Sequence, residues 1–164
     1  MNACRALAAA VATAVALTAL PALAKTQRWS SQGDILTMDP HAQNEGLNNS
    51  ISEYVYEPLV TRGKDLRIEP CLATSWQLVN PTTMRFKLRP NVKFHDGAPF
   101  NADDVVFSIE RALAPTSNFK PYLQGVTGAK KIDDMTVEIT TSGPNPVLLA
   151  QLTEVRMMSK AWAT

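Results

Sequence analysis

The chain has 164 residues, of which 45% are hydrophobic, and its 16 basic and 15 acidic side chains leave a formal net charge of +1. Such a balance argues against a nucleic-acid-binding protein, which normally carries a clear excess of basic residues, and it provides no special attraction to anionic membranes. Residues 25–164 are long enough to bury one modest hydrophobic core.

Residues 1–24 are typical of a secretory signal peptide. Arg5 supplies a positive charge, residues 6–20 are apolar apart from two threonines, and residues 22–24 form the small-x-small pattern of a cleavage site. The apolar stretch is too short and too rich in alanine for a bilayer-spanning helix, so a membrane anchor is the less favoured alternative. We therefore expect export to the periplasm, with a soluble mature chain that starts at Lys25.

Two cysteines are present. We expect only Cys71 to remain after cleavage, because Cys4 lies in the leader. A single cysteine can form no intrachain disulfide. The apolar neighbour Leu72 favours an inert, buried thiol at this position.

The segment after the leader predicts short elements separated by turns. Residues 27–31 are typical of a short strand, and the Asp39–Pro40 step ends the next extended piece, because proline disfavours helical backbone in the residue before it. Beyond a polar stretch, Asn49 or Ser50 is expected to cap a helix that ends before Pro58. The expected buried face of this helix consists of apolar residues at helical spacing: Ile51, Tyr54, Val55 and Leu59.

Residues 76–88 change to a period of two, which is typical of a β-hairpin with one buried face. The second strand alternates the apolar residues Met84, Phe86 and Leu88 with the basic residues Arg85, Lys87 and Arg89. An ordinary solvated surface is the favoured interpretation of the basic face, and the binding of an anion or a partner is the alternative. Residues 129–140 predict a second hairpin, and residues 147–152 predict a short helix.

Residues 101–113 predict an amphipathic helix between the two hairpins. Asn101 is a good N-cap, and Asp103 and Asp104 fall in the first turn, where carboxylates interact favourably with the helix dipole. This position accounts for the acidic pair without acid–base catalysis. Hairpins mixed with short helices predict an α+β fold with antiparallel strands.

The most distinctive run of residues lies between positions 70 and 111. It contains residues 70–73, Ser75-Trp76, the segment FKLRPNVKFHDG at residues 86–97, the segment FNADDVVFS at residues 100–108, and Arg111. In this order the segments resemble the signature region of the extracellular solute-binding proteins of family 5, which include oligopeptide-, dipeptide- and nickel-binding proteins of ABC importers. Met38-Asp39-Pro40 upstream and residues 131–140 and 146–152 downstream also fit the family order.

The resemblance implies a periplasmic-binding-protein-like lobe, a fold that belongs to the α/β class in full-length members. Residues 25–164 would form the N-terminal part of lobe I, including most of the small subdomain, with lobe II absent. The implied function is the non-enzymatic substrate-binding component of an ABC importer, which binds peptides or similar small solutes in the periplasm and delivers them to permease subunits in the inner membrane. The resemblance implies no cofactor, no metal and no nucleic acid, and it favours a monomer.

In the family, the loop after the first strand and the polar segment that follows line the ligand cleft. The resemblance therefore implies six candidate ligand-binding residues: Ser31, Gln32, Gly33, Asn44, Glu45 and Gly46. Small polar side chains and main-chain groups suit ligands of varied sequence, because they bind the peptide backbone without selecting its side chains. An ordinary solvated loop is the alternative.

Other chemistry finds little support in the sequence. His95 and Asp96 are neighbours and point to opposite sides of an extended chain, so a structural histidine is favoured over a metal ligand. No nucleophile–base pair or metal motif is visible. A small secreted hydrolase and a structural remnant that binds no ligand are the alternatives to a solute-binding protein.

Overall fold

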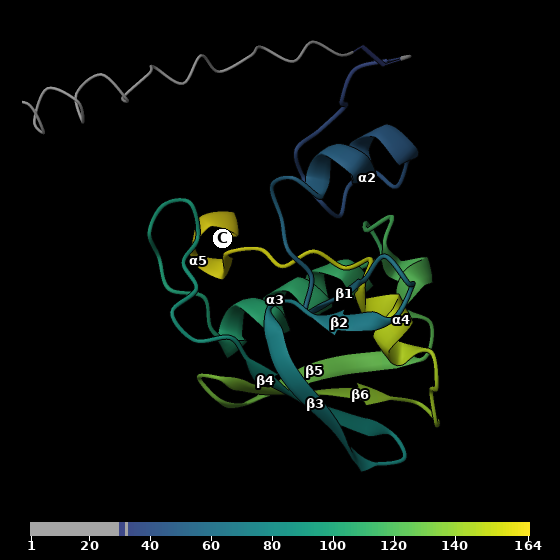
Figure 1. Cartoon of the computed structure of the whole chain (residues 1–164), viewed down its shortest axis with the longest axis vertical. Helices are drawn as coiled ribbons and strands as arrows, with labels where there is room; N and C mark the ends of the chain where they lie inside the picture. The colour runs from purple at the N-terminus through teal and green to yellow at the C-terminus, as the bar shows by residue number, and fades with distance from the viewer. Residues whose placement is uncertain (1–29, 32) are drawn as a thin grey trace, which may run out of the picture. The chain divides into compact units, whose positions relative to one another are not determined.

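The computed structural model describes residues 30, 31 and 33–164. The chain divides into two units, Met1–Gln32 and Gly33–Thr164, and the description below concerns the second. The expected signal peptide and nearly all of the expected strand at residues 27–31 lie outside the described residues. The elements of Figure 1, in chain order, are α2 (Gly46–Ser52), β1 (Val60–Arg62), β2 (Ile68–Pro70), β3 (Ala73–Asn80), β4 (Thr83–Leu88), α3 (Ala102–Leu113), the 3-10 helix η1 (Lys120–Leu123), β5 (Val126–Asp133), β6 (Thr136–Thr141), α4 (Leu148–Leu152) and α5 (Lys160–Ala163).

A four-stranded antiparallel sheet is the main β structure, with strand order β3-β4-β6-β5. Both predicted hairpins are confirmed: β3 pairs with β4, and β5 pairs with β6. The inner strands β4 and β6 join the two hairpins, with Phe86 opposite Val137. A separate pair, β1 and β2, is connected by a turn at which Leu66 adopts a positive φ of 64°.

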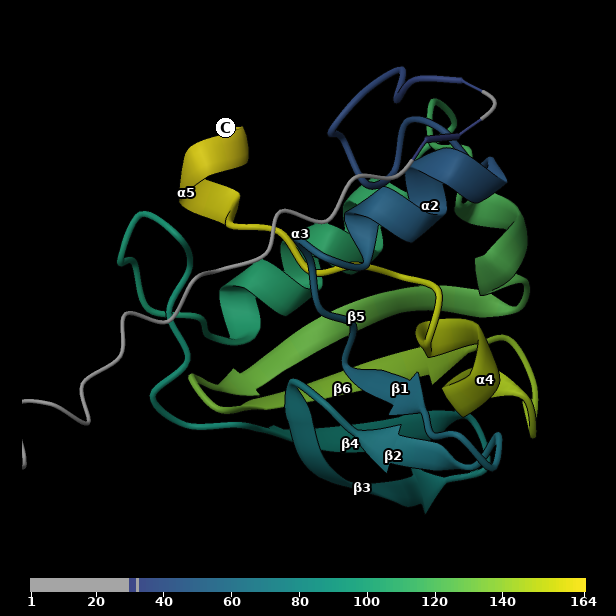
Figure 2. The same cartoon turned by 45° about the horizontal axis from the view of Figure 1, so that its top comes forward.

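One face of the sheet is buried under α3, as the period of two predicts. Phe86, Val137 and Ile139 have no exposed surface, and neither do Val105 and Ile109 of α3. Figure 2 shows α3 lying along the sheet, where it contacts β5 and β6. Burying an aromatic ring and several branched aliphatic side chains together stabilises this layer, at roughly 1.5–3 kcal/mol for each large side chain.

The predicted helix cap at Asn101 is confirmed. The Asn101 Oδ1 accepts a hydrogen bond from the Asp103 N–H at 2.7 Å, and the Asp104 Oδ2 accepts one from the Asn101 N–H at 3.0 Å. This reciprocal arrangement is a capping box, which satisfies backbone donors that the first helical turn leaves unpaired. Asp103 also pairs with Lys131 of β5 at 2.6 Å.

The first helix differs from its prediction. It begins at Gly46 rather than after Asn49 or Ser50, and its N-cap residue Glu45 makes no side-chain capping bond. The predicted apolar face is wrong for Tyr54, which lies beyond the helix with 88% of its surface exposed, whereas Leu59 is buried as predicted but also lies beyond the helix. The buried residues of α2 are Asn48 and Ser52. Hydrogen bonds from Asn48 to a distant part of the chain, described below, decide the position of this helix and outweigh the local capping preference.

The remaining short elements follow the sequence pattern. The predicted helix at residues 147–152 is confirmed as α4, which contacts η1 and β1. A single hydrophobic cluster runs through the second unit and includes Leu59, Phe100, Leu152 and Val155. Within the described part of the chain, no helix combines the length and the hydrophobicity needed to span a membrane.

Candidate functional site

The candidate ligand-binding residues lie at the two ends of one stretch, residues 31–46. Ser31 and Gly33 are exposed, and Gln32 lies outside the described residues. At the other end Asn44, Glu45 and Gly46 are exposed around the start of α2. Asn44 is held in place, because its Oδ1 accepts hydrogen bonds from Asn49 Nδ2 at 3.0 Å and from the Tyr122 hydroxyl at 3.2 Å.

Between these two groups the chain has no regular secondary structure. The side chain of Asn48, which belongs to α2, is hydrogen-bonded to the main chain of this stretch. The Asn48 Oδ1 accepts a hydrogen bond from the Leu36 N–H at 3.1 Å, and its Nδ2 donates to the Thr37 carbonyl at 2.9 Å. Only 2% of Asn48 is exposed. A buried amide whose donor and acceptor are both bonded to one segment fixes that segment strongly, because any shift would leave both amide groups unpaired.

Asp39 connects the same segment to α3. Its two carboxylate oxygens accept hydrogen bonds from Arg111 Nη1 at 2.8 Å and Nη2 at 2.5 Å. The Asp39 Oδ1 also accepts one from the His41 N–H at 3.0 Å. Burial by itself raises the pKa of Asp39, but the hydrogen bonds from Arg111 and His41 and the charge of Arg111 lower it below its usual value. The bidentate pair is therefore ionised at neutral pH.

His41 connects the segment to the C-terminal part of the chain. The ring is buried with 1% exposure, and its Nε2 lies 3.0 Å from the Arg156 carbonyl oxygen. Burial and the nearby charge of Arg111 lower the His41 pKa to about 4, so the ring is neutral at pH 7. Because a carbonyl can only accept, the proton lies on Nε2, and Nδ1 is left buried without a partner in the structure.

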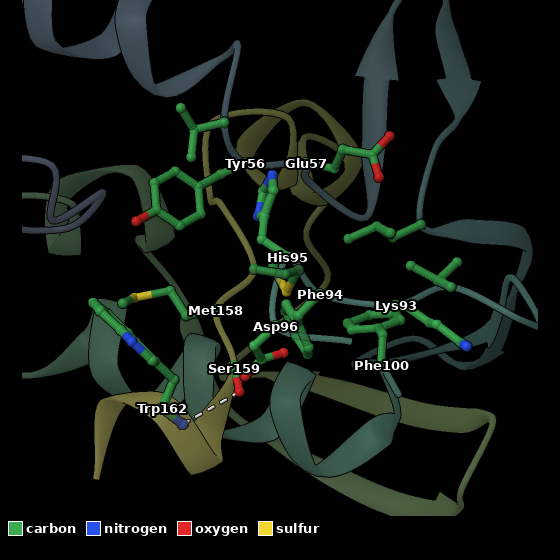
Figure 3. A pocket seen from close by; sticks show the side chains of 14 residues that line it. Tyr56, Glu57, Lys93, Phe94, His95, Asp96, Phe100, Met158, Ser159 and Trp162 are labelled. Carbon is green, nitrogen blue, oxygen red and sulfur yellow. Dashed lines mark hydrogen bonds between the residues drawn. The ribbon is translucent and has the colours of Figure 1, made fainter. Parts of the chain in front are cut away.

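A pocket of about 320 Å³ lies elsewhere, where three distant segments meet. Figure 3 shows the side chains around it, with Tyr56, Met158 and Trp162 on one side and His95 near the middle. Most of its lining is apolar, and none of the five candidate residues that the structure describes belongs to it. Sequence reasoning did not foresee this pocket, because its walls come from residues far apart in the chain: 55–57, 72, 92–96, 100, 157–159 and 162.

A second, more polar pocket of about 420 Å³ lies between residues 53–58, which follow α2, the strand β1 and the segment after α4. Arg156 is its most buried charge: its Nη1 donates to the Thr153 carbonyl at 2.7 Å and its Nη2 to Glu53 Oε1 at 2.9 Å. The half-buried Cys71 also lines it, and burial followed by the charge of Glu57 raises the pKa of this thiol. A raised thiol pKa disfavours the nucleophilic thiolate, in line with the inert cysteine that the sequence predicts.

Two further possibilities were a basic surface on the first hairpin and a metal site. The basic side chains of β4 and of Arg89 just after it have partners: Arg85 pairs with Glu138 at 2.5 Å, Lys87 donates to Thr136, and Arg89 pairs with Glu57. Across residues 30, 31 and 33–164, no cluster of three or more His, Cys, Asp or Glu side chains is placed to hold a metal ion.

Comparison with known proteins identifies the class to which this fold belongs. The structure of the binding protein AgaA from A. tumefaciens R10 in complex with agropinic acid matches with a TM-score of 0.73 at 30% identity, and covers 79% of this chain and 27% of AgaA. NikZ from Campylobacter jejuni, in complex with Ni(L-His), matches with a TM-score of 0.69 at 27% identity over 79% of this chain and 26% of NikZ. The fold is therefore that of part of a periplasmic binding protein.

The sequence comparisons define the family. Residues 67–162 match the profile of the bacterial extracellular solute-binding proteins, family 5 Middle. The glutathione-binding protein GsiB of Pectobacterium atrosepticum is 34% identical over 139 residues, which cover 82% of this chain and 27% of GsiB. This chain belongs to family 5 of the bacterial extracellular solute-binding proteins, as the resemblance in the sequence implies. It spans about a quarter of the length of the relatives that it matches.

Members of this family are binding proteins rather than enzymes, and they act in the periplasm or outside the cell. The signature segment at residues 70–111 supplies core and helix-capping residues. Its aromatic residues Phe86 and Phe100 are buried in the core, and Asn101 and Asp104 cap a helix. These residues build the scaffold, and the exposed loops remain as the candidates for ligand contact.

Proposed function

We propose that this chain acts in the substrate-binding component of an ABC importer, where it binds small peptide-like solutes in the periplasm and delivers them to permease subunits of the inner membrane. The observation that carries the proposal is the 34% identity to a glutathione-binding protein over 82% of this chain. The structural match to AgaA, which was solved with agropinic acid, supports the same class of small polar ligand.

Glutathione is the first ligand to test, because the sequence relative reported above, GsiB, is a glutathione-binding protein. Opines such as agropinic acid and metal chelates such as Ni(L-His) are further probes, since proteins of the same fold were solved with them. We propose that ligand contacts come from Ser31, Gln32, Gly33, Asn44, Glu45 and Gly46. The described members of this set are exposed, and main-chain and small polar groups suit the backbone of a short peptide.

Calorimetric titration of the purified chain with glutathione, and with a mixture of di- to pentapeptides, tests the proposal. A ligand that binds only the folded state raises the free energy of unfolding, by about 2.7 kcal/mol at a concentration roughly 100-fold above Kd. We expect binding heat and a matching rise in Tm. The double variant Asn44→Ala/Glu45→Gln should weaken binding, whereas Glu69→Gln, an exposed glutamate on β2, should leave it unchanged.

The opposite results have distinct meanings. An absence of both heat and thermal shift with glutathione, the peptides, agropinic acid and Ni(L-His) would contradict the proposal and favour a chain with a purely structural role. Binding that survives the double variant but is lost on changes at the Tyr56, Met158 and Trp162 pocket would support ligand binding and contradict the proposed contact residues.

A further inference from the structure

The segment at residues 36–42 lacks helix and strand, yet most of its main-chain polar groups are hydrogen-bonded. Asn48 holds the Leu36 N–H and the Thr37 carbonyl, as described above. The Met38 carbonyl accepts from the Tyr56 hydroxyl at 3.0 Å, the Asp39 N–H donates to Thr37 Oγ1 at 3.0 Å, and the Ala42 N–H donates to the Asp39 carbonyl at 3.4 Å. The His41 carbonyl accepts from the Asn118 N–H at 3.1 Å and from the Ser117 hydroxyl at 3.4 Å, and the Ala42 carbonyl accepts from Asn118 Nδ2.

The partners come from separate parts of the chain. Asn48 lies on α2, Arg111 lies near the end of α3, and Asn118 lies in the loop that precedes η1. Arg111 is 72 positions away from Asp39, and Arg156, whose carbonyl accepts from His41, is 115 positions away from His41. A loop that depended only on its own sequence would sample several conformations, whereas contacts from several elements select one.

The charged contact is the strongest of these. Arg111 binds both carboxylate oxygens of Asp39, and charge-assisted bidentate bonds are about twice as strong as neutral ones. The same carboxylate accepts the His41 N–H, so a single side chain fixes both α3 and the turn at Pro40. Loss of the Asp39 charge would therefore loosen the segment at two points.

We propose that Asn48, Asp39 and Arg111 are positioning residues: they hold residues 36–42 in one conformation and thereby fix the candidate ligand-binding residues Asn44, Glu45 and Gly46 that follow this segment. The role of the flanking residues rests on the proposed function, whereas the fixing of the segment does not. A preformed segment binds more tightly than a mobile one, because the entropy of ordering is already lost in the free protein.

Amide hydrogen exchange on the purified chain tests the proposal without a ligand. The segment has four amides that donate hydrogen bonds: Leu36, Asp39, His41 and Ala42. In Asp39→Asn and in Asn48→Asp we expect peptides that cover residues 35–43 to exchange about tenfold faster, the factor that corresponds to the loss of one charge-assisted or doubly bonded contact. Arg111→Lys keeps the charge but loses the bidentate geometry, and its exchange should fall between those of Arg111→Met and the wild type.

The ion pair between Arg85 and Glu138 offers a matched control. Its shortest distance, 2.5 Å, equals that of the Arg111–Asp39 pair, and its side chains are 35% and 15% exposed compared with 31% and 30%. It joins β4 to β6, and both of its side-chain hydrogen bonds lie between these two strands. Glu138→Gln should lower Tm by an amount similar to Asp39→Asn and leave exchange of residues 35–43 at the wild-type rate.

Two outcomes overturn the proposal. One is unchanged exchange at residues 35–43 in both folded variants, Asp39→Asn and Asn48→Asp. The other is equal acceleration in Glu138→Gln, which would show a general loss of stability. Where the wild type binds glutathione, Kd should weaken in Asp39→Asn and not in Glu138→Gln. Where the wild type does not bind it, glutathione is not the ligand, and the exchange result alone decides whether these residues fix the segment.

Discussion

At the scale of single residues, the least ordinary group is the buried ring of His41. Its Nε2 is bonded to a backbone carbonyl, and its Nδ1 is buried without a partner in the described structure. An unpaired buried nitrogen costs free energy, on the order of 1–3 kcal/mol. The ring therefore contributes to the fold through its position between Phe119 and the Arg156 carbonyl, and only in its neutral form.

The neutral ring predicts a dependence of stability on pH. The His41 pKa falls from 6.5 to about 4 on folding, so between these values the unfolded chain binds a proton that the folded chain does not. Stability should therefore decrease as the pH falls from 6.5 towards 4, by roughly 3 kcal/mol in total. Asp39 adds to the decrease with the same sign, mainly at the acid end of this range and below it, because its pKa is lowered from 3.8 in the folded chain.

Thermal or urea unfolding at a series of pH values from 7 to about 4.5 measures this effect. His41→Gln and His41→Asn cannot titrate, so both should show a weaker decrease in stability towards low pH than the wild type, whatever their stability at pH 7. Equal slopes for the wild type and both variants would show that His41 does not determine the pH dependence.

At the scale of secondary structure, α3 is the element with the best-defined start. Its capping box joins Asn101 and Asp104, and its last turn carries Arg111, where a positive charge interacts favourably with the helix dipole. The same residues connect the helix to its surroundings, because Asp104 also accepts from the Lys160 N–H at 2.9 Å and Arg111 binds Asp39. The helix is therefore the element to which both the segment at residues 36–42 and the C-terminal segment are attached.

Loss of the cap should destabilise the protein measurably. Asn101→Ala removes the acceptor for the Asp103 N–H and should lower the free energy of unfolding by about 1 kcal/mol. Glu110→Ala, at an exposed position of the same helix, is the control and should change it by less than about 0.5 kcal/mol. Urea unfolding followed by circular dichroism compares the two. Equal stability of both variants would mean that the cap contributes little in this context.

At the scale of the whole molecule, the chain is similar to about a quarter of each relative, and its second unit contains a single hydrophobic cluster. Alternating apolar residues of β4 and β6, the apolar stripe of α3 and the residues of α4 meet in that cluster. The segment at residues 36–42 lies outside the sheet, and side chains of α2 and α3 hold it in place.

Export is the prediction that belongs to this scale. The pattern at residues 22–24 predicts that a signal peptidase cleaves after Ala24, which leaves Lys25 as the new N-terminus. Mass spectrometry of the chain from a periplasmic extract should detect a product that starts at Lys25. Ala22→Asp/Ala24→Asp, which removes the small residues of the pattern, should accumulate the uncleaved precursor. Recovery of only the uncleaved chain from the cytoplasm would contradict the prediction.

The amino-acid sequence by itself determined the two hairpins, the capped helix α3 and the family. Each of these signals is local: alternation in β4 and β6, the Asn101 cap, and a signature whose parts occur in a fixed order. Adjacent residues are sufficient for such signals, because strand periodicity and helix capping depend on neighbours within a few positions.

Only the tertiary structure decided where α2 begins, why Asn48 and His41 are buried, and which residues hold the segment at residues 36–42. The sequence favoured a helix capped by Asn49 or Ser50, but Asn48 bonds to Leu36 and Thr37, and Asp39 bonds to Arg111 across 72 positions. No local pattern reveals such partners. Their free energy comes from satisfying buried polar groups once the core has brought distant segments together, and that depends on the complete packing of the chain.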